Sequence, residues 1–487
     1  MLFNSYIFIF LFFPLTLIGY YGFNYAKKYK AALAFLIGMS MWFYGYNNIY
    51  YLAILIVSIS INYVLISGMT KTSSRRLKRL FLWAGILLNI GILFYFKYYD
   101  FFIDNINSAL KAQIPLLKLM LPLGISFYTF QQLSCVIDSY KGECEKYSLL
   151  EYALYVSFFP QLIAGPIVYH NELIPQFQNT DNRKINFENL SRGIYAFALG
   201  LAKKVLIADT FSGIVTVGYN NITDLNTTSV ILVIVCYSLQ LYFDFSGYCD
   251  MAYGMGYMLN IKLPVNFNSP YKAESFADLW SRWHMTLTRF FVKYVYIPLG
   301  GSRRGKARTY LNTLIVFIVS GIWHGANWTF ILWGTLNGIL ITVERFTKIS
   351  SLKIPKIIKM TVTYSIFTFT CSLFRSASVK DAGMLWTRLF RGGFGPVYQP
   401  LIDTFGDLTE MKFLYRAGLG GIMTSYPWLM LSLFTVISLA ACFTLKNTQE
   451  KTAQLTLSNK KFLVVVILML WSIMSLSGIS EFLYFNF

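Results

Sequence analysis

The chain contains three histidines: His170, His284 and His324. Two of them follow a tryptophan directly, in the pairs Trp283-His284 and Trp323-His324. An imidazole can accept and return a proton near neutral pH, which is the property of a general base. His324 lies in the uncharged run 309–343, and an ionisable group within an apolar run marks a functional site. A histidine that hydrogen-bonds a helix kinked near Gly325 is the alternative explanation.

The other two histidines have different surroundings. His284 lies in the segment 278–289, where aromatic residues alternate with Arg282 and Arg289, as in an interfacial or re-entrant helix. An aromatic belt with snorkelling cations explains that pattern equally well. His170 ends an apolar run and has no special company in the sequence, so a structural role is favoured.

Aspartates and cysteines give weaker signals. Asp244 and Asp250 are six positions apart and do not share a helix face well, so local hydrogen bonding is favoured over a paired-carboxylate or cation site. The cysteines form no CxxC pair and are interpreted as small core residues, so no metal site is expected. P-loop, HExxH and GxSxG motifs are absent from the sequence. The cysteines are at positions 135, 144, 236, 249, 371 and 442.

The composition shows what must position these groups. Of 487 residues, 56% are hydrophobic and only 13% are charged, with a mean hydropathy of +0.51. A helical span needs about 20 apolar residues, so the chain is predicted to be an all-α polytopic membrane protein with about ten to twelve transmembrane helices. A soluble enzyme and a disordered chain are excluded. The uncharged runs are 1–26, 31–70, 119–137, 152–171, 225–243, 309–343, 417–445 and 462–480.

The net charge of +20 comes from loop clusters, which are expected to face the cytoplasm. We predict two membrane segments in each of the uncharged runs 31–70 and 309–343, with breaks near Asn47 and near Gly325. Both termini are then predicted to be extracytoplasmic, with 1–26 as a retained first span. The cations are spread over many loops, so membrane lipids are expected partners and nucleic acid is not. The clusters lie at 27–30, 75–79, 303–308, 345–359 and 446–461.

Three segments follow from the pattern of interruptions. Residues 1–120 are predicted to form N-terminal transmembrane helices, and 346–487 C-terminal ones with an extracytoplasmic segment at about 375–425. In 121–345, Pro, Gly, Asp and His break the apolar runs. Irregular backbone at membrane depth is tolerated where it is buried in protein or lines a cavity, so this middle segment is the predicted catalytic core.

Six motifs of the core resemble the membrane-bound O-acyltransferase (MBOAT) family, in particular its bacterial branch with the alginate O-acetylation protein. They occur in the family order and span about 210 residues. The motifs are LPLGISFYTF at 121–130, FPQLIAGPI at 159–167, YFDFSGY at 242–248, WSRWHM at 280–285, YIPLGGS at 296–302 and GIWHGA at 321–326.

The resemblance implies a central tunnel, surrounded by re-entrant or interfacial helices, that joins the two sides of the membrane at His324 and His284. It implies acyl transfer, with His324 as base and His284 orienting substrate or donating to the oxyanion. Trp283, Trp323 and Asn327 are candidates for shaping the pocket, and Arg282 for holding an anionic group. Arg303 and Arg304 are candidates for contacting an anionic cytosolic donor, although a plain topology signal also explains them.

The same resemblance implies the reactants. An acyl thioester such as acetyl-CoA is expected as co-substrate, with no tightly bound cofactor and no metal. The acceptor is expected to be an extracytoplasmic polysaccharide such as alginate, cellulose or peptidoglycan, served by an extracytoplasmic acetyltransferase partner at a bacterial cell membrane. D-alanyl transfer to teichoic acid from a carrier protein is one alternative. A cation-coupled transporter using Asp244 and Asp250 is another, although the two halves of the chain show no internal repeat.

Overall fold

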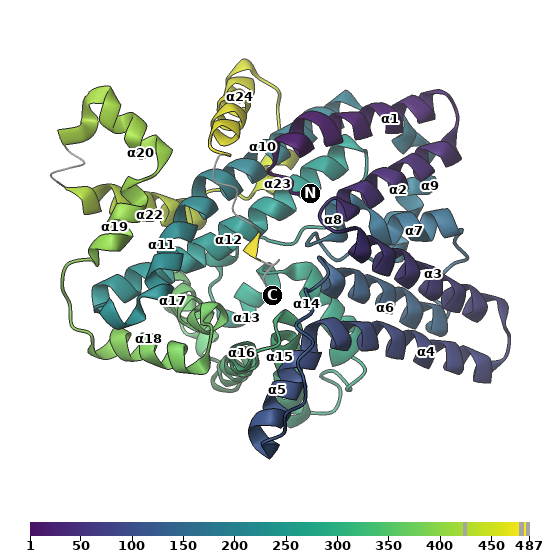
Figure 1. Ribbon diagram of the computed structural model, residues 1–487, viewed down its shortest axis with the longest axis horizontal. Helices are drawn as coiled ribbons and strands as arrows, with labels where there is room; N and C mark the ends of the chain where they lie inside the picture. Colours follow the sequence, from purple (N-terminus) through teal and green to yellow (C-terminus); the bar gives the residue numbers. More distant parts are fainter. Residues whose placement is uncertain (422–425, 477–481, 484–487) are drawn as a thin grey trace. The chain divides into compact units, whose positions relative to one another are not determined.

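The computed structural model describes residues 1–421, 426–476 and 482–483. Within these ranges the chain is helical and contains no strand, which confirms the all-α prediction. The helices, drawn in Figure 1 with colours that follow the chain, divide into two compact units. Unit 1 comprises 1–198 and 248–265, and unit 2 comprises 199–247 and 266–487.

Unit 1 begins with a hydrophobic helical bundle in which α2 and α3 are separated by a short turn. Asn48 marks the start of α3, because its side chain accepts a hydrogen bond from the Tyr50 amide and caps this helix. The predicted division of run 31–70 into two segments is therefore confirmed. The helices are α1 (Phe13–Tyr25), α2 (Tyr29–Gly45), α3 (Ile49–Lys71), α4 (Arg75–Leu93), α5 (Tyr99–Leu110), α6 (Ile125–Lys141), α7 (Leu149–Ser157), α8 (Phe159–Leu162), α9 (His170–Gln178) and α10 (Phe187–Ala202), of which residues 199–202 belong to unit 2.

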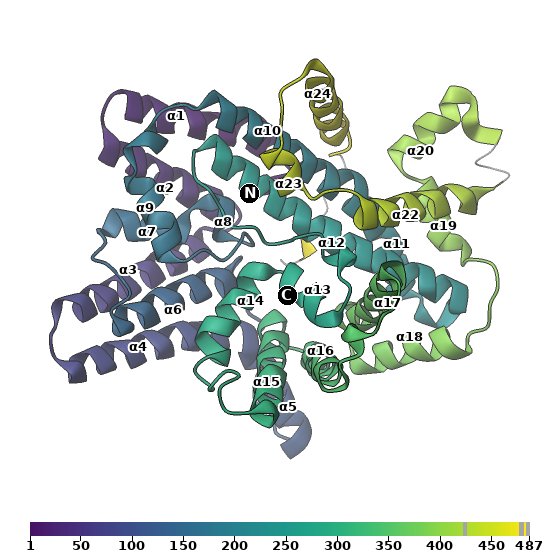
Figure 2. The same cartoon turned by 180° about the vertical axis from the view of Figure 1, so that it is seen from behind.

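Unit 2 includes short and long helices that follow α12 in the chain, and Figure 2 shows them from behind. The predicted catalytic histidines, His284 and His324, belong to this unit. Helix α12 runs through both units, since its residues up to Gly247 belong to unit 2 and those from Tyr248 to unit 1. The remaining helices are α11 (Asp209–Asn220), α12 (Thr227–Met258), α13 (Phe276–Arg282), α14 (Met285–Phe291), α15 (Lys306–His324), α16 (Trp328–Thr347), α17 (Lys356–Arg375), α18 (Val379–Arg391), α19 (Gln399–Gly406), α20 (Thr409–Leu414), α22 (Pro427–Thr444), α23 (Thr448–Ala453) and α24 (Asn459–Met474).

Helices α15 and α16 meet at a sharp break that confirms the predicted interruption of run 309–343. α15 ends at His324, and Asn327 begins α16 by accepting a hydrogen bond from the Thr329 amide. The two helices pack closely because glycines face each other. A methyl group on Gly321 would overlap the Phe330 carbonyl oxygen and lie 3.2 Å from Gly334 Cα. Small residues permit this approach in membrane helices.

Five helical stretches in the described residues are long and apolar enough to cross a membrane: Phe8–Tyr25, Ile49–Lys71, Arg75–Leu110, Thr227–Met258 and Lys356–Arg375. The chain is thus a multi-pass membrane protein. The total of ten to twelve spans stays a prediction, since it includes shorter and more interrupted helices such as α15. The division at 120 and 345 also stays a prediction. Parts of the predicted segments 375–425 and 462–480, namely 422–425 and 477–480, lie outside the described residues, as does the C-terminal end at 484–487.

Candidate active site

A cavity of about 280 Å³ lies in unit 2, with exposed residues such as Ser281 and Arg345 in its lining, and one face of α15 forms a wall of it. Thr313, Phe317, Ser320 and His324 recur at helical spacing along that face. With a rise of 1.5 Å per residue, the eleven residue-to-residue steps from Thr313 to His324 span about 16 Å. The cavity is lined by Ala277, Trp280, Ser281, Trp283, His284, Leu287, Thr288, Phe291, Val292, Tyr296, Thr313, Val316, Phe317, Ser320, His324, Ile341 and Arg345.

His324 is the last residue of α15 and lines one end of this cavity. Its side chain is 4% exposed and packs edge-on against Trp333 and Phe374, at ring centroid distances of 5.3 and 5.1 Å. The last carbonyls of a helix carry partial negative charge. They therefore stabilise the positive charge that the ring acquires when it takes a proton.

His284 lies between α13 and α14, outside the five candidate spans, and its backbone is strained. Its φ of 46° and ψ of 50° are left-handed, which is uncommon for a residue other than glycine. Hydrogen bonds to Asn266 from residues next to His284 hold this turn. One of them runs from the Met285 N–H to the Asn266 carbonyl at 3.0 Å. Strain of this kind persists where the surroundings determine it, commonly at active sites.

The Asn266 side chain decides the tautomer of His284. Asn266 Oδ1 accepts from the Thr286 backbone N–H at 3.3 Å, which can only donate, so the amide orientation is defined. The same oxygen lies 3.1 Å from His284 Nδ1, so Nδ1 carries the proton. Burial lowers the pKa of His284 to about 3, so the ring is neutral at physiological pH. Its Nε2 is then a hydrogen-bond acceptor.

The two imidazoles come close together without stacking. Their ring centroids are 6.5 Å apart, and Trp323 contacts both rings at 6.1 and 4.9 Å. Both line the same cavity, whose walls are largely aromatic and aliphatic. Such a site excludes water and strengthens electrostatic effects on a reacting group. It can deprotonate a hydroxyl held between the rings.

The other predicted pocket residues fall into three situations. Trp283 lines the cavity and packs against Phe267 at 5.0 Å. Trp323 contacts the imidazoles without belonging to the lining in the described part of the chain. Among the described residues, Asn327 and Arg282 do not line the cavity. Asn327 instead caps α16 and donates a hydrogen bond to the Ala377 carbonyl. Arg282 forms an ion pair with Asp278 at 2.8 Å.

Arg303 and Arg304 lie exposed in the turn before α15. Gly300 and Gly301, with φ of 103° and 57°, form this turn in conformations that favour glycine. Asn312 on α15 donates to the Gly301 carbonyl at 2.9 Å and fastens the turn to the helix. The two arginines therefore stand at the N-terminal end of α15, and His324 stands at its other end.

Several residues of the site were missed by sequence reasoning. Trp280 and Tyr296 belong to quoted motifs and line the cavity, so their motifs carried a signal. Arg345 lines the cavity and donates to Thr313 Oγ1 at 2.9 Å, but in the sequence it is one cation of a basic cluster. Asn266 carried no signal, because it lies 18 positions before His284 in a segment without periodicity.

Two sequence interpretations need correction. His170 has close polar company: its Nε2 lies 3.3 Å from Asp138 Oδ2, and its Nδ1 lies 2.9 Å from the Tyr147 hydroxyl. Cys135 and Cys144 are more than separate core residues, since their sulfurs are 3.6 Å apart. The residues of each group are separated in the sequence, and packing within unit 1 brings them together.

Asp244 takes the local role that was favoured for it, with a lysine as partner. Lys204 Nζ lies 2.7 Å from Asp244 Oδ1 and 2.7 Å from Asp209 Oδ1, and all three side chains are largely buried. The Leu483 amide also donates to Asp244 Oδ2 at 2.9 Å. The buried carboxylate is thus neutralised within unit 2.

The apolar helices and the two buried imidazoles at one cavity describe an integral membrane protein with a candidate site for proton transfer. A model described as "MBOAT, membrane-bound O-acyltransferase family" matches residues 92–374. The chain therefore belongs to this family and is an O-acyltransferase, as the motifs predicted.

Named relatives agree with this assignment. The chain is 42% identical to a peptidoglycan O-acetyltransferase of Helicobacter pylori over 78% of each chain. It is 34% identical to a protein of Pseudomonas syringae named "Probable alginate O-acetylase AlgI", over 87% of this chain and 79% of the relative. A teichoic acid D-alanyltransferase of Bacillus subtilis is 28% identical over 46% of this chain and 59% of its own length.

Proposed function

We propose that the protein moves an acetyl group from a cytoplasmic thioester across the membrane for the O-acetylation of an extracytoplasmic polysaccharide. The observation that carries this proposal is the cavity along α15, which extends about 16 Å from Thr313 to His324. A thioester arm entering beside Arg345 can deliver its carbonyl between the two imidazoles. A thioester is already activated, so the enzyme needs to supply only alignment and proton transfer.

In the proposed step, His324 accepts the proton of the acceptor hydroxyl as its oxygen attacks the thioester carbonyl carbon. The tetrahedral intermediate collapses by breaking the carbon–sulfur bond, and the leaving thiolate takes the proton back from His324. His284 is neutral with its proton on Nδ1, so its Nε2 accepts a hydrogen bond from a substrate or from the protonated His324. This geometry favours an orienting role for His284 over donation to the oxyanion.

The donor we propose is acetyl-CoA or another acyl thioester, used as a co-substrate. Its phosphates would meet the exposed cations Arg303 and Arg304 at the N-terminal end of α15, because guanidinium groups bind phosphate in bidentate fashion. Arg345 lies at the same end of the cavity and would contact the thioester arm of the donor. No tightly bound cofactor is part of the proposal.

The acceptor we favour is peptidoglycan, because the relative named for it is 42% identical, with alginate, cellulose or a similar glycan next. We place the protein in the bacterial inner membrane, with the basic loops in the cytoplasm and both termini outside. Lipids would surround it. An extracytoplasmic acetyltransferase would complete the reaction and dock on the segment at 375–425.

The test measures ester-linked acetyl released by mild base from the cell wall and the exopolysaccharide. Cells carry the wild type, no copy of the gene, His324→Ala, or Ile322→Ala as the matched control. Ile322 is on the same helix but is 39% exposed, so its truncation should leave acetylation at the wild-type level. We expect His324→Ala to match the deletion at equal protein amounts in the membrane.

Other outcomes discriminate between the alternatives. If the deletion leaves acetyl unchanged and lowers esterified D-alanine, the D-alanyl alternative, supported by the Bacillus subtilis relative, replaces the acetyl proposal. If the deletion loses acetyl and His324→Ala keeps it, His324 is not the base. A cation-coupled transporter would tolerate His324→Ala, and its proposed carboxylate Asp244 is already neutralised by Lys204.

A further inference from the structure

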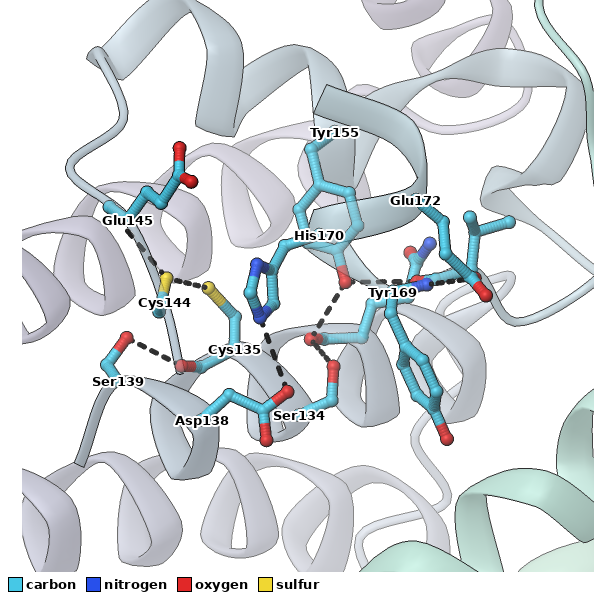
Figure 3. Close-up of polar contacts among 12 residues, drawn as sticks. Ser134, Cys135, Asp138, Ser139, Cys144, Glu145, Tyr155, Tyr169, His170 and Glu172 are labelled. Carbon is cyan, nitrogen blue, oxygen red and sulfur yellow. Dashed lines mark hydrogen bonds and ion pairs between the residues drawn. The ribbon is translucent and has the colours of Figure 1, made fainter. Parts of the chain in front are cut away.

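A second group of chemically active side chains lies in unit 1, apart from the acyl-transfer cavity. Cys135 and Asp138 are one turn apart on α6, Cys144 is in the loop after α6, and His170 is the first residue of α9 (Figure 3). Cys135, Asp138 and His170 are buried, and Cys144 is partly exposed. Nothing in the acyl-transfer mechanism uses these side chains.

The distances fit a metal ion bound by two sulfurs and one nitrogen. The sulfurs of Cys135 and Cys144 are 3.6 Å apart, and these two atoms and an imidazole nitrogen of His170 all lie within 4.8 Å of one another. A zinc–sulfur bond is about 2.3 Å, so two sulfurs on a zinc tetrahedron are separated by about 3.8 Å. The observed separation of the sulfurs is close to that value, whereas a disulfide requires about 2.05 Å.

Asp138 orients His170 as a metal-binding histidine is usually oriented. Its Oδ2 lies 3.3 Å from His170 Nε2, so an Nε2–H group donates to the carboxylate. The nitrogen left for a metal is then Nδ1, in place of its 2.9 Å contact with the Tyr147 hydroxyl. A carboxylate behind a ligating histidine holds the tautomer and raises the basicity of the ligand.

We propose that Cys135, Cys144 and His170 bind one Zn²⁺ ion, with Asp138 as the positioning residue and a water as the fourth ligand. Zinc prefers this mixture of thiolate and imidazole ligands. Binding replaces the two thiol protons, which are released, and the two thiolates neutralise the dication. The partly exposed side of Cys144 gives the ion an entry path.

The site would fasten three elements that are separate along the chain. It joins the C-terminal half of α6, the loop 142–148 and the start of α9. α6 begins within the LPLGISFYTF motif, and α9 follows the FPQLIAGPI motif. A metal bound only in the folded state stabilises that state by its binding free energy, so zinc at this site would stabilise unit 1.

The test uses the full-length protein purified in detergent with a thiol reductant. Metal content is measured by mass spectrometry for the wild type, Cys135→Ser, Cys144→Ser and Cys442→Ala. Cys442 is a buried cysteine on α22 outside the group and is the matched control. We expect about one zinc per chain in the wild type and control, and less than a tenth of that in the two serine variants.

A second measurement keeps the proposal testable if the serine variants fail to fold. Replacing zinc by Co²⁺ in the wild type should give the intense near-ultraviolet band of thiolate-to-cobalt charge transfer. Asp138→Asn should lower metal affinity by roughly 10–100-fold without removing a ligand. Wild-type protein that contains no zinc and gives no cobalt–thiolate band overturns the proposal, as does a Cys135–Cys144 disulfide in the metal-free, reductant-treated protein.

Discussion

Replacing Gly321 by Ala should damage acyl transfer through the position of His324. The methyl group would come far closer than 3.0 Å to the Phe330 carbonyl oxygen, whereas ordinary contact begins at 3.4 Å. α15 and α16 must therefore separate locally, by a distance on the order of 1 Å. His324 lies three residues after Gly321 and packs on Trp333 of α16, so the separation displaces the proposed base relative to His284. A displacement of about 1 Å can reduce a rate about 100-fold.

The assay compares glycan acetylation and thermal stability in detergent for Gly321→Ala and Gly383→Ala. A methyl on Gly383 of α18 would meet nothing within 4 Å, so the control should stay active and gain up to about 1 kcal/mol of helix stability. Gly321→Ala should lose about 1–3 kcal/mol by overpacking and most of its activity. Wild-type acetylation by Gly321→Ala at equal protein amount would refute the reasoning.

Three further predictions concern buried polar groups. Asn266→Leu should lower the turnover rate more than it changes donor KM, because the acceptor for His284 Nδ1 and for Thr286 is lost; an unchanged turnover rate would contradict this role. His284 has a folded pKa of about 3, below its unfolded value of about 6.5, so folding stability should fall by roughly 1 kcal/mol per pH unit as the pH drops from about 6.5 to about 3. His284→Gln should flatten that slope in thermal melts, and equal slopes would show that the ring is not buried neutral. Lys204→Met should destabilise the protein by about 3–5 kcal/mol because it leaves Asp244 buried and unneutralised, and the double variant with Asp244→Leu should recover most of the loss in the same melts.

Local patterns predicted much of this fold. The breaks near Asn47 and Gly325 were visible because polar and flexible residues interrupt runs that are otherwise uncharged, and the structure ends and starts helices there. The two Trp-His pairs were recognisable because ionisable residues are rare in apolar segments. The residue pattern alone favoured a functional role for His324, and the family resemblance paired His284 with it; both line one cavity.

Other features depend on contacts between distant segments and leave no periodic trace. Asn266 lies 18 positions before His284 and sets its tautomer. Its side-chain oxygen accepts hydrogen bonds from His284 Nδ1 and from the Thr286 amide. Arg345 joins the cavity wall because α16 packs against α15.

Cys135, Cys144 and His170 show the same limit most clearly. Their spacing matches no metal-binding motif, and it is packing within unit 1 that brings their side chains together. Helix boundaries and apolar faces follow from short-range propensity and hydropathy, which neighbouring residues carry. The direction of a side chain and its partner across the fold follow from packing. The two candidate histidines were visible in the sequence, while the protonation of His284 and the thiol–imidazole group were decided by the tertiary structure.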